Sequence, residues 1–353
     1  MSIIFAILIF SFLIFIHELG HFVTAKLSGV QVNEFALFMG PAIFKKKIGE
    51  TTYSLRCIPI GGYCAMEGED TDTDNPRSFQ KAKWWKRLIV LLAGAFMNFV
   101  FGMLLFAIVS IPMKQFVTPV IHSTEPGCTI VQEGGLQVGD RFLELDGETI
   151  YDQSDFSIIL MLNPGDYHDI VVERNGEKLT FENYHMEKHE FLNENGEPEL
   201  RYGFSFGFED ATFEGKLQWA WKNTRKTVRD ARLSLQMLFT GKAGMGDMMG
   251  PVGIVSVMSD AASSAPSTLD AVMNLLYIGA FLAVNLAVMN LLPIPALDGG
   301  RAVCLLITVV VEKITRKKLD PKYEGYIHAA GMVLLLGLMA IILFKDVFQI
   351  FMG

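Results

Sequence analysis

The sequence predicts a polytopic α-helical membrane protein with four transmembrane helices, a membrane-associated β-sheet and one extracytoplasmic mixed α/β domain. Three observations support this fold class. Of the 353 residues, 51% are hydrophobic, which is high for a soluble chain of this length. Four apolar stretches are long enough to cross about 30 Å of hydrocarbon. Between the second and third stretches lies a long acidic segment with the alternation and turns of a soluble domain.

These features divide the chain into consecutive predicted segments. The first stretch lacks the basic n-region and cleavage site of a signal peptide, so we interpret it as a retained span. The segments are transmembrane helix 1 at 1–25, a cytoplasmic-side β-sheet or reentrant loop at 26–87, transmembrane helix 2 at 88–112, an extracytoplasmic segment at 113–214, an amphipathic interfacial region at 215–262, a broken transmembrane helix 3 at 271–311 and transmembrane helix 4 at 326–349.

Basic residues predict the orientation of the spans. Residues 25–87 hold ten Lys or Arg, and the loop after the third span is also basic. Its basic residues are Lys313, Arg316, Lys317, Lys318 and Lys322. By the positive-inside rule both loops are cytoplasmic, so both termini and the acidic segment are extracytoplasmic. The segment 113–214 has six Lys or Arg against twenty-one Asp or Glu, which agrees with that placement.

Two regions outside the spans show strand patterns. Residues 30–35 and 52–58 alternate apolar and polar side chains, which predicts a small sheet against the membrane. In the acidic segment, strands are expected at 130–131, 141–145 and 170–172, with a short helix at 154–162. The modest net charge of −8 does not suggest a nucleic-acid partner.

The run Gly-Leu-Gln-Val-Gly-Asp at 135–140 resembles the turn that precedes a strand in PDZ domains. We therefore expect a PDZ-like domain at about 117–183, a fold that binds extended peptides by adding a strand to its sheet edge. A small β-rich domain without a peptide function is the alternative. The amphipathic stretch 215–240 fits either an interfacial helix or a connecting helix packed on that domain.

The motif His17-Glu18-Leu19-Gly20-His21 lies within the first apolar stretch. Residues four apart share one face of a helix, so the two imidazoles can bind one Zn²⁺ and Glu18 can reach a water molecule beside it. An ionisable side chain inside a span costs about 2.5–3.5 kcal/mol, which makes such a group a functional candidate by default. A second pair, His185 and His189, lies in a soluble acidic stretch and is expected to be solvated surface.

A catalytic zinc takes three protein ligands and keeps one position open. Among the other spans, the acidic or imidazole candidates are Asp298 in the third and His328 near the start of the fourth. Asp298 follows two prolines and precedes two glycines, a helix break that is tolerated at membrane depth only beside protein or a cavity. Asp298 is therefore the favoured third ligand and His328 the weaker alternative. The four cysteines match no zinc or disulfide spacing.

These motifs together resemble the site-2 protease family of intramembrane zinc metalloproteases, peptidase family M50, and most of all its bacterial RseP and RasP members. The resemblance rests on His17–His21, the Asn290–Gly300 run, the stretches Gly94–Asn98 and Gly250–Ile254, and the PDZ-like segment. It implies one zinc held by His17, His21 and Asp298, with Glu18 as the general base. It further implies that Asn290 and a β-loop around Gly61, Gly62 and Tyr63 hold an unwound substrate. The chain has room for one PDZ-like domain, where some members have two.

The resemblance implies a function and a location. The expected activity is hydrolysis within the transmembrane segment of single-pass proteins, either anti-sigma factors or remnant signal peptides, after a prior cleavage by another protease. The expected location is the bacterial plasma membrane, with the active site toward the cytoplasm. Two other classes are considered: a membrane scaffold, which could dispense with Glu18, and a metal transporter, which would favour ionisable groups on several spans.

Overall fold

The computed structural model describes residues 2–69, 73–192, 197–244, 246, 248–316 and 322–352. The chain forms two compact units. Unit 1 comprises Met1–Val109 and Met245–Gly353, and unit 2 comprises Ser110–Gly244. Because unit 1 is assembled from both ends of the chain, residues far apart in sequence can meet inside it.

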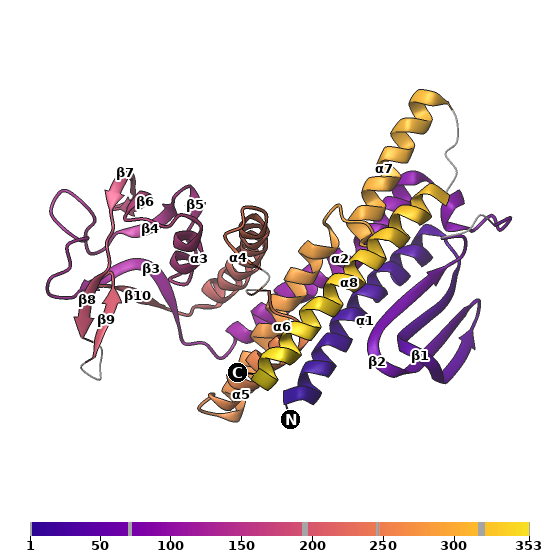
Figure 1. Cartoon of the computed structure of the whole chain (residues 1–353), viewed down its shortest axis with the longest axis horizontal. Helices are drawn as coiled ribbons and strands as arrows, with labels where there is room; N and C mark the ends of the chain where they lie inside the picture. Colours follow the sequence, from indigo (N-terminus) through magenta and orange to yellow (C-terminus); the bar gives the residue numbers. More distant parts are fainter. Residues whose placement is uncertain are drawn as a thin grey trace. The chain divides into compact units, whose positions relative to one another are not determined.

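Unit 1 is mainly helical (Figure 1). Four of its described helices are long and apolar enough to cross a membrane, over Phe5–Ser28, Trp84–Ser110, Thr268–Asn290 and Gly325–Asp346. This finding confirms the predicted number of spans. The helices of this unit are α1 (Ser2–Ser28), α2 (Trp84–Ser110), α5 (Pro251–Ser263), α6 (Thr268–Asn290), α7 (Asp298–Thr315) and α8 (Lys322–Met352), with a short 3-10 helix η1 at Phe79–Lys81.

The third apolar stretch is broken, as the two prolines in it predict. Helix α6 ends at Asn290 and α7 begins at Asp298, so residues 291–297 form an irregular connection. Proline lacks an N–H and disfavours helical geometry in the residue before it, which explains why neither helix extends through this segment.

Strands β1 (Val32–Ile48) and β2 (Thr51–Met66) are bent, so they pair with each other along more than one stretch. Each strand bends, β1 near Phe38 and Gly40 and β2 near Gly61, all of which have positive φ. Residues 34–37 of β1 therefore pair with 62–65 of β2 on one side and with 52–55 on the other, while 42–48 pairs with 51–56. The stretches predicted at 30–35 and 52–58 are parts of these longer strands, and residues 62–66 form one edge of the sheet.

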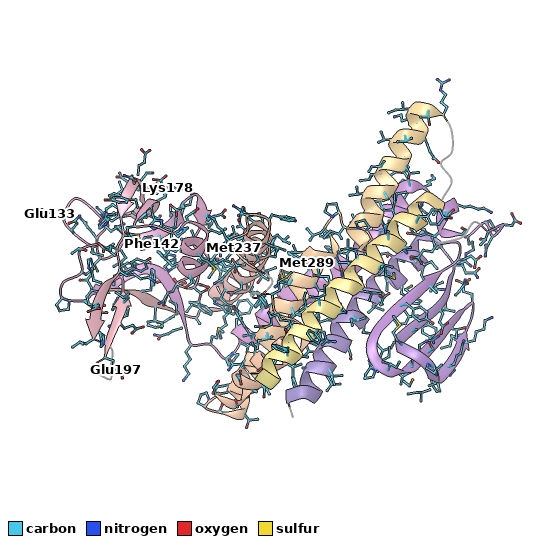
Figure 2. The ribbon with its side chains drawn as sticks, in the orientation of Figure 1. Glu133, Phe142, Lys178, Glu197, Met237 and Met289 are labelled. Carbon is cyan, nitrogen blue, oxygen red and sulfur yellow. The ribbon has the colours of Figure 1, made fainter. Side chains whose placement is uncertain are left out.

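Unit 2 is built on a six-stranded sheet in the order β10-β3-β4-β6-β7, with β5 paired to β4. The strands are β3 (Gln115–Thr124), β4 (Arg141–Leu145), β5 (Glu148–Thr149), β6 (Tyr167–Arg174), β7 (Glu177–His185) and β10 (Phe204–Asp210), and a separate hairpin joins β8 (His189–Leu192) to β9 (Pro198–Arg201). The sheet includes β10, which lies beyond the predicted range 117–183. Phe142 lies inside the unit, whereas Glu133 and Lys178 lie at its outer side (Figure 2).

Four local expectations for unit 2 can be compared with its elements. Strands occur at the predicted 141–145 and 170–172, and the expected short helix is α3 (Asp155–Leu162). The strand expected at 130–131 was wrong: Val131 makes one isolated bridge to Leu136. Gln132 N–H donates to Leu136 C=O, so the chain reverses within a few residues and cannot continue as a strand. Ile130 is fully buried in a loop, which explains its apolar character.

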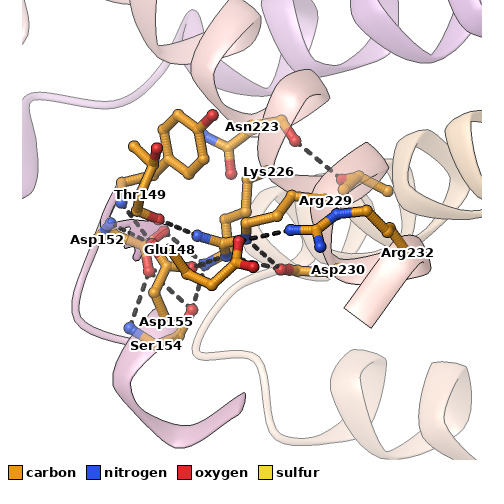
Figure 3. Close-up of polar contacts among 12 residues, drawn as sticks. Glu148, Thr149, Asp152, Ser154, Asp155, Asn223, Lys226, Arg229, Asp230 and Arg232 are labelled. Atoms are coloured by element: carbon orange, nitrogen blue, oxygen red, sulfur yellow. Dashed lines mark hydrogen bonds and ion pairs between the residues drawn. The ribbon is translucent and has the colours of Figure 1, made fainter. Parts of the chain in front are cut away.

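Helix α4 (Phe213–Phe239) packs on the sheet unit, which agrees with the second of the two alternatives for this stretch. Leu233 and Met237 join the apolar core of unit 2. The same face carries Lys226 and Arg229, which would be costly to bury alone. Both meet carboxylates at the start of α3, so the charges are paired (Figure 3).

Some expectations fall outside the described residues or are not tested by the structure. Lys317 and Lys318 of the second basic loop lie outside the described residues. The side of the membrane on which each loop lies remains a prediction from the positive-inside rule.

Candidate metal centre and active site

His17 and His21 lie one turn apart on α1 and present their Nε2 atoms to the same point. The two Nε2 atoms are 3.2 Å apart. The Oδ2 atom of Asp298, at the start of α7, lies 3.1 Å from His17 Nε2 and 3.3 Å from His21 Nε2. Residues separated by about 280 positions in the chain thus form a triangle of one oxygen and two nitrogens.

This triangle fits a zinc ion. Ligand atoms about 2.0–2.1 Å from a tetrahedral zinc lie roughly 3.3 Å apart, close to the three edges observed. Asp298 Oδ2 is buried between the two histidine Nε2 atoms, so a cation shared by the three atoms would satisfy the buried carboxylate. Within the described ranges, His17, His21 and Asp298 are the group of three that could hold a metal ion.

The break between α6 and α7 positions Asp298. Ala296 adopts a left-handed conformation with φ of 78°, and Leu297 N–H donates to Ile294 C=O, so the connection turns tightly. A side chain on Gly299 or Gly300 would collide with carbonyl groups of the same connection. Asp298 is followed by two glycines because only glycine lets α7 start so close to that backbone.

His328, the alternative third ligand, has a different position in the structure. Its Nδ1 accepts a hydrogen bond from Ala296 N–H at 3.0 Å, and its side chain is buried. It is not part of the group formed by His17, His21 and Asp298. His328 therefore supports the irregular connection before Asp298, and the prediction that Asp298 is the favoured candidate agrees with the geometry.

Glu18 lies between α1 and the edge of the β1–β2 sheet. The backbone of Cys64 lies beside its carboxylate. A Cβ on Gly62 would lie 3.5 Å from the Glu18 Cγ atom, so this part of β2 is within van der Waals range of Glu18. Glu18 is thus held beside the two histidines and next to a strand edge.

The remaining predicted residues are Asn290 and the β-loop residues Gly61, Gly62 and Tyr63. Asn290 ends α6, and its Nδ2 atom lies 3.4 Å from His17 Nδ1, so it is part of the site. Gly61 and Gly62 lie in the bend of β2 that leads to the edge strand. The Tyr63 hydroxyl instead contacts Arg56. Burial and a hydrogen bond with Glu34 raise the pKa of the Tyr63 phenol above its ordinary value of 10.

Helix α2 contributes residues to which the sequence analysis assigned no role. Val90 C=O accepts from His21 Nδ1 at 2.8 Å, and Asn98 Nδ2 lies 3.5 Å from His17 Nδ1. A Cβ on Gly94 would lie 2.7–2.8 Å from atoms of the His17 ring, so Gly94 leaves room for the imidazoles. The available signal was a glycine and an asparagine four residues apart in an otherwise apolar span.

His185 and His189 of the acidic segment are not part of the group of described residues that could hold a metal ion. His185 lies on β7, is half exposed and pairs with Glu187 at 3.7 Å. His189 lies on β8 and contacts the Thr129 hydroxyl at 2.8 Å. The spacing of these two histidines does not lie on a helix. His185 is exposed and His189 partly exposed, in line with the predicted surface stretch, whereas Met186 between them is buried in the core of unit 2.

Comparison with known proteins identifies the family to which the chain belongs. The model of Peptidase family M50 matches residues 5–338. The chain belongs to peptidase family M50. A Clostridium perfringens protein that is named as a zinc metalloprotease is 38% identical to this M50 protein over 98% of both chains. The zinc metalloprotease RasP of Oceanobacillus iheyensis is 28% identical over 98% of both chains.

These similarities confirm the predicted family and a zinc-dependent peptidase activity. Together with the four apolar helices, they identify this M50 protein as a membrane protein. The similarity to RasP extends over nearly the whole chain, so it covers both motif regions and the segment between them.

Proposed function

We propose that this M50 protein hydrolyses peptide bonds within the transmembrane segments of single-pass membrane proteins. One observation carries the proposal: His17, Glu18 and His21 lie inside a helix that is apolar enough to cross a membrane, and Asp298 meets them there. Ionisable groups in such a helix are costly, so their convergence is best explained by chemistry performed at that depth.

In the proposed mechanism His17, His21 and Asp298 would hold one zinc ion. When bound, zinc would polarise the scissile carbonyl and bring the pKa of a water molecule to about 7. Glu18 would take a proton from that water and transfer it to the leaving amine. The Cys64 backbone lies beside the Glu18 carboxylate, so the proposed base is adjacent to the edge strand of β2.

A substrate helix must unwind before cleavage, because its carbonyl groups are hydrogen-bonded within the helix. The edge residues 62–66 of β2 pair with β1 on one side, and Gly62 at the start of this edge lies within van der Waals range of Glu18. An unwound segment could add to this edge as a further strand. Asn290, next to His17, is the proposed side-chain anchor, and Gly61, Gly62 and Tyr63 shape the edge.

The proposed substrates are anti-sigma factors or remnant signal peptides that another protease has already shortened. The proposed location is a bacterial plasma membrane, with the active site toward the cytoplasm and the PDZ-like unit 2 outside. The acidic character of residues 113–214 and the ten basic residues of 25–87 support this orientation. The PDZ-like unit would bind a newly formed C-terminus or exclude large ectodomains.

Replacement of the base tests the proposal. Glu18→Gln should retain one zinc per chain while cleavage of a single-pass membrane substrate falls by about 10²–10⁴-fold, because proton transfer is lost and the ligands remain. Zinc content is measured on the purified protein. Cleavage is measured in vesicles, and proteomics of membranes from cells that carry the variant would identify fragments that accumulate.

Glu133→Gln is the matched control, because Glu133 is exposed in unit 2, whereas the residues of the metal centre belong to unit 1. It should cleave at the unmodified rate. Cleavage by Glu18→Gln at the unmodified rate would refute the assignment of the base. Zinc flux across vesicles without proteolysis would favour a transporter, and neither flux nor proteolysis would favour a scaffold.

A further inference from the structure

One face of α2 contacts the side chains of both His17 and His21. Val90, Gly94 and Asn98 are four residues apart and therefore lie along the same side of the helix. Val90 C=O meets His21, and Gly94 leaves the space that both imidazoles occupy. Asn98, one turn beyond Gly94, meets His17.

The two imidazoles have the same requirement at Nδ1. Both Nε2 atoms face the Asp298 carboxylate, so in a neutral ring that binds metal through Nε2 the proton is on Nδ1. That N–H group needs an acceptor, and metal-binding histidines usually donate it to a carbonyl or carboxylate. His21 donates to Val90 C=O at 2.8 Å. Among the described residues, the side-chain amides of Asn98 and Asn290 lie 3.5 and 3.4 Å from His17 Nδ1.

Asn98 is the better placed of these two amides to act as a permanent acceptor. Its side chain is fully buried, and its Oδ1 atom has no hydrogen-bond partner among the described residues. A half-turn of the amide exchanges its oxygen and nitrogen with little change in shape and directs the carbonyl toward His17. Asn290 is only partly buried, at the end of α6, so its amide can still reach a substrate.

We propose that Asn98 is a positioning residue whose amide carbonyl accepts the Nδ1–H of His17. The bond fixes the orientation of the ring and keeps Nε2 unprotonated toward Asp298. It gives His17 the same kind of support that Val90 C=O gives His21, from the same face of α2. The inference rests on the proposed role of His17 as a metal ligand through Nε2.

Two substitutions distinguish an acceptor from a donor or a packing residue. Asn98→Leu has a similar shape but cannot accept a hydrogen bond, whereas Asn98→Asp retains an acceptor and loses the N–H donor. Asn98→Leu should bind zinc about 10- to 100-fold more weakly, the usual effect of losing such a partner, while Asn98→Asp should bind at least as tightly as the unmodified protein. Asn285→Leu is the control, because among the described residues the side-chain amide of Asn285 donates to Phe281 C=O of its own helix.

The full-length proteins are compared in detergent. Zinc affinity is measured by chelator competition, and cobalt substitution reports the ligand geometry through its visible absorption. Circular dichroism and thermal unfolding establish that each variant is folded. Nitrogen NMR of labelled histidine should show His17 protonated at Nδ1 in the unmodified protein and in Asn98→Asp.

Each outcome bears on one of the two proposals. Unchanged zinc affinity and cobalt absorption in Asn98→Leu would overturn the inference. A loss in Asn98→Asp as large as that in Asn98→Leu would also overturn it, because the amide would then act as a donor. If Asn98→Leu fails to fold, the response of Asn98→Asp still decides. Retention of tight zinc binding by His17→Ala would instead refute the proposed ligand set.

Discussion

Gly94 is a residue whose missing side chain shapes the metal centre. Any larger residue would place its Cβ within 2.7–2.8 Å of the His17 ring and closer still to His21. Gly20, inside the histidine motif, has a related role because its Cβ would lie 2.5 Å from Ala93 C=O on α2. Two glycines thus allow α1 and α2 to approach closely enough for α2 to support the imidazoles.

We predict that Gly94→Ala weakens zinc binding by about 10- to 100-fold, because overpacking costs about 1–3 kcal/mol and here displaces a ligand. Chelator competition on the purified protein measures the change. Gly337→Ala on α8 is the control, since no atom of the described residues, apart from its chain neighbours and its own helix backbone, lies within 4 Å of its added Cβ. Zinc affinity of Gly94→Ala equal to that of the control would contradict the prediction.

At the scale of elements, α4 is attached to unit 2 through buried charges. Asp155, fully buried at the start of α3, pairs with Arg229 and with Lys226 Nζ at 3.2 Å. Lys226 also binds Asp152 at 2.7 Å. Burial alone would raise the pKa of Asp152, but the neighbouring Lys226 holds this pKa below its ordinary value of 3.8. The network resists separation of α4 from α3 because separation would expose unpaired partners (Figure 3).

We predict that Arg229→Leu lowers the free energy of unfolding of unit 2 by about 3 kcal/mol, since it leaves a buried carboxylate short of one partner. Hydrogen exchange of the α3 and α4 amides measures the loss. The matched control is Arg232→Leu, whose side chain is 55% exposed and pairs with Glu148 at the surface. A surface pair contributes about 0–1 kcal/mol, so equal effects of the two variants would show that burial does not matter here.

At the scale of the whole molecule, the metal centre joins the two ends of the chain within unit 1. His17 and His21 come from the first helix, and Asp298 comes from a helix that begins almost 280 residues later. His328 adds α8 to the same arrangement through Ala296. A zinc ion held by these three residues would therefore link α1 directly to α7.

We predict that removing zinc with a chelator increases hydrogen exchange around residues 17–21 and 291–300 and leaves residues 110–244 unchanged. At a free zinc concentration 100 times the Kd, binding adds about 2.7 kcal/mol to the stability of the unit that holds it. Exchange is followed by mass spectrometry with and without the chelator. An increase of equal size throughout residues 110–244 would contradict the assignment of the site to unit 1.

The sequence by itself determined the features that depend on local periodicity and composition. Four apolar stretches predicted the four helices that could span a membrane, and helical spacing predicted that His17 and His21 share one face. The prolines between Asn290 and Asp298 predicted the break, because a proline in the interior of a helix removes a backbone hydrogen bond and clashes with the preceding turn. These properties act over a few residues and can be evaluated without knowledge of distant contacts.

Only the tertiary structure decided which distant residues meet. The search of the spans favoured Asp298 over His328, and packing placed Asp298 against the histidines and His328 against Ala296. The bends in β1 and β2, the addition of β10 to the sheet and the support from Val90, Gly94 and Asn98 had no local pattern strong enough to predict them. Each depends on long-range packing, in which one residue is selected by the shape and polarity of another element.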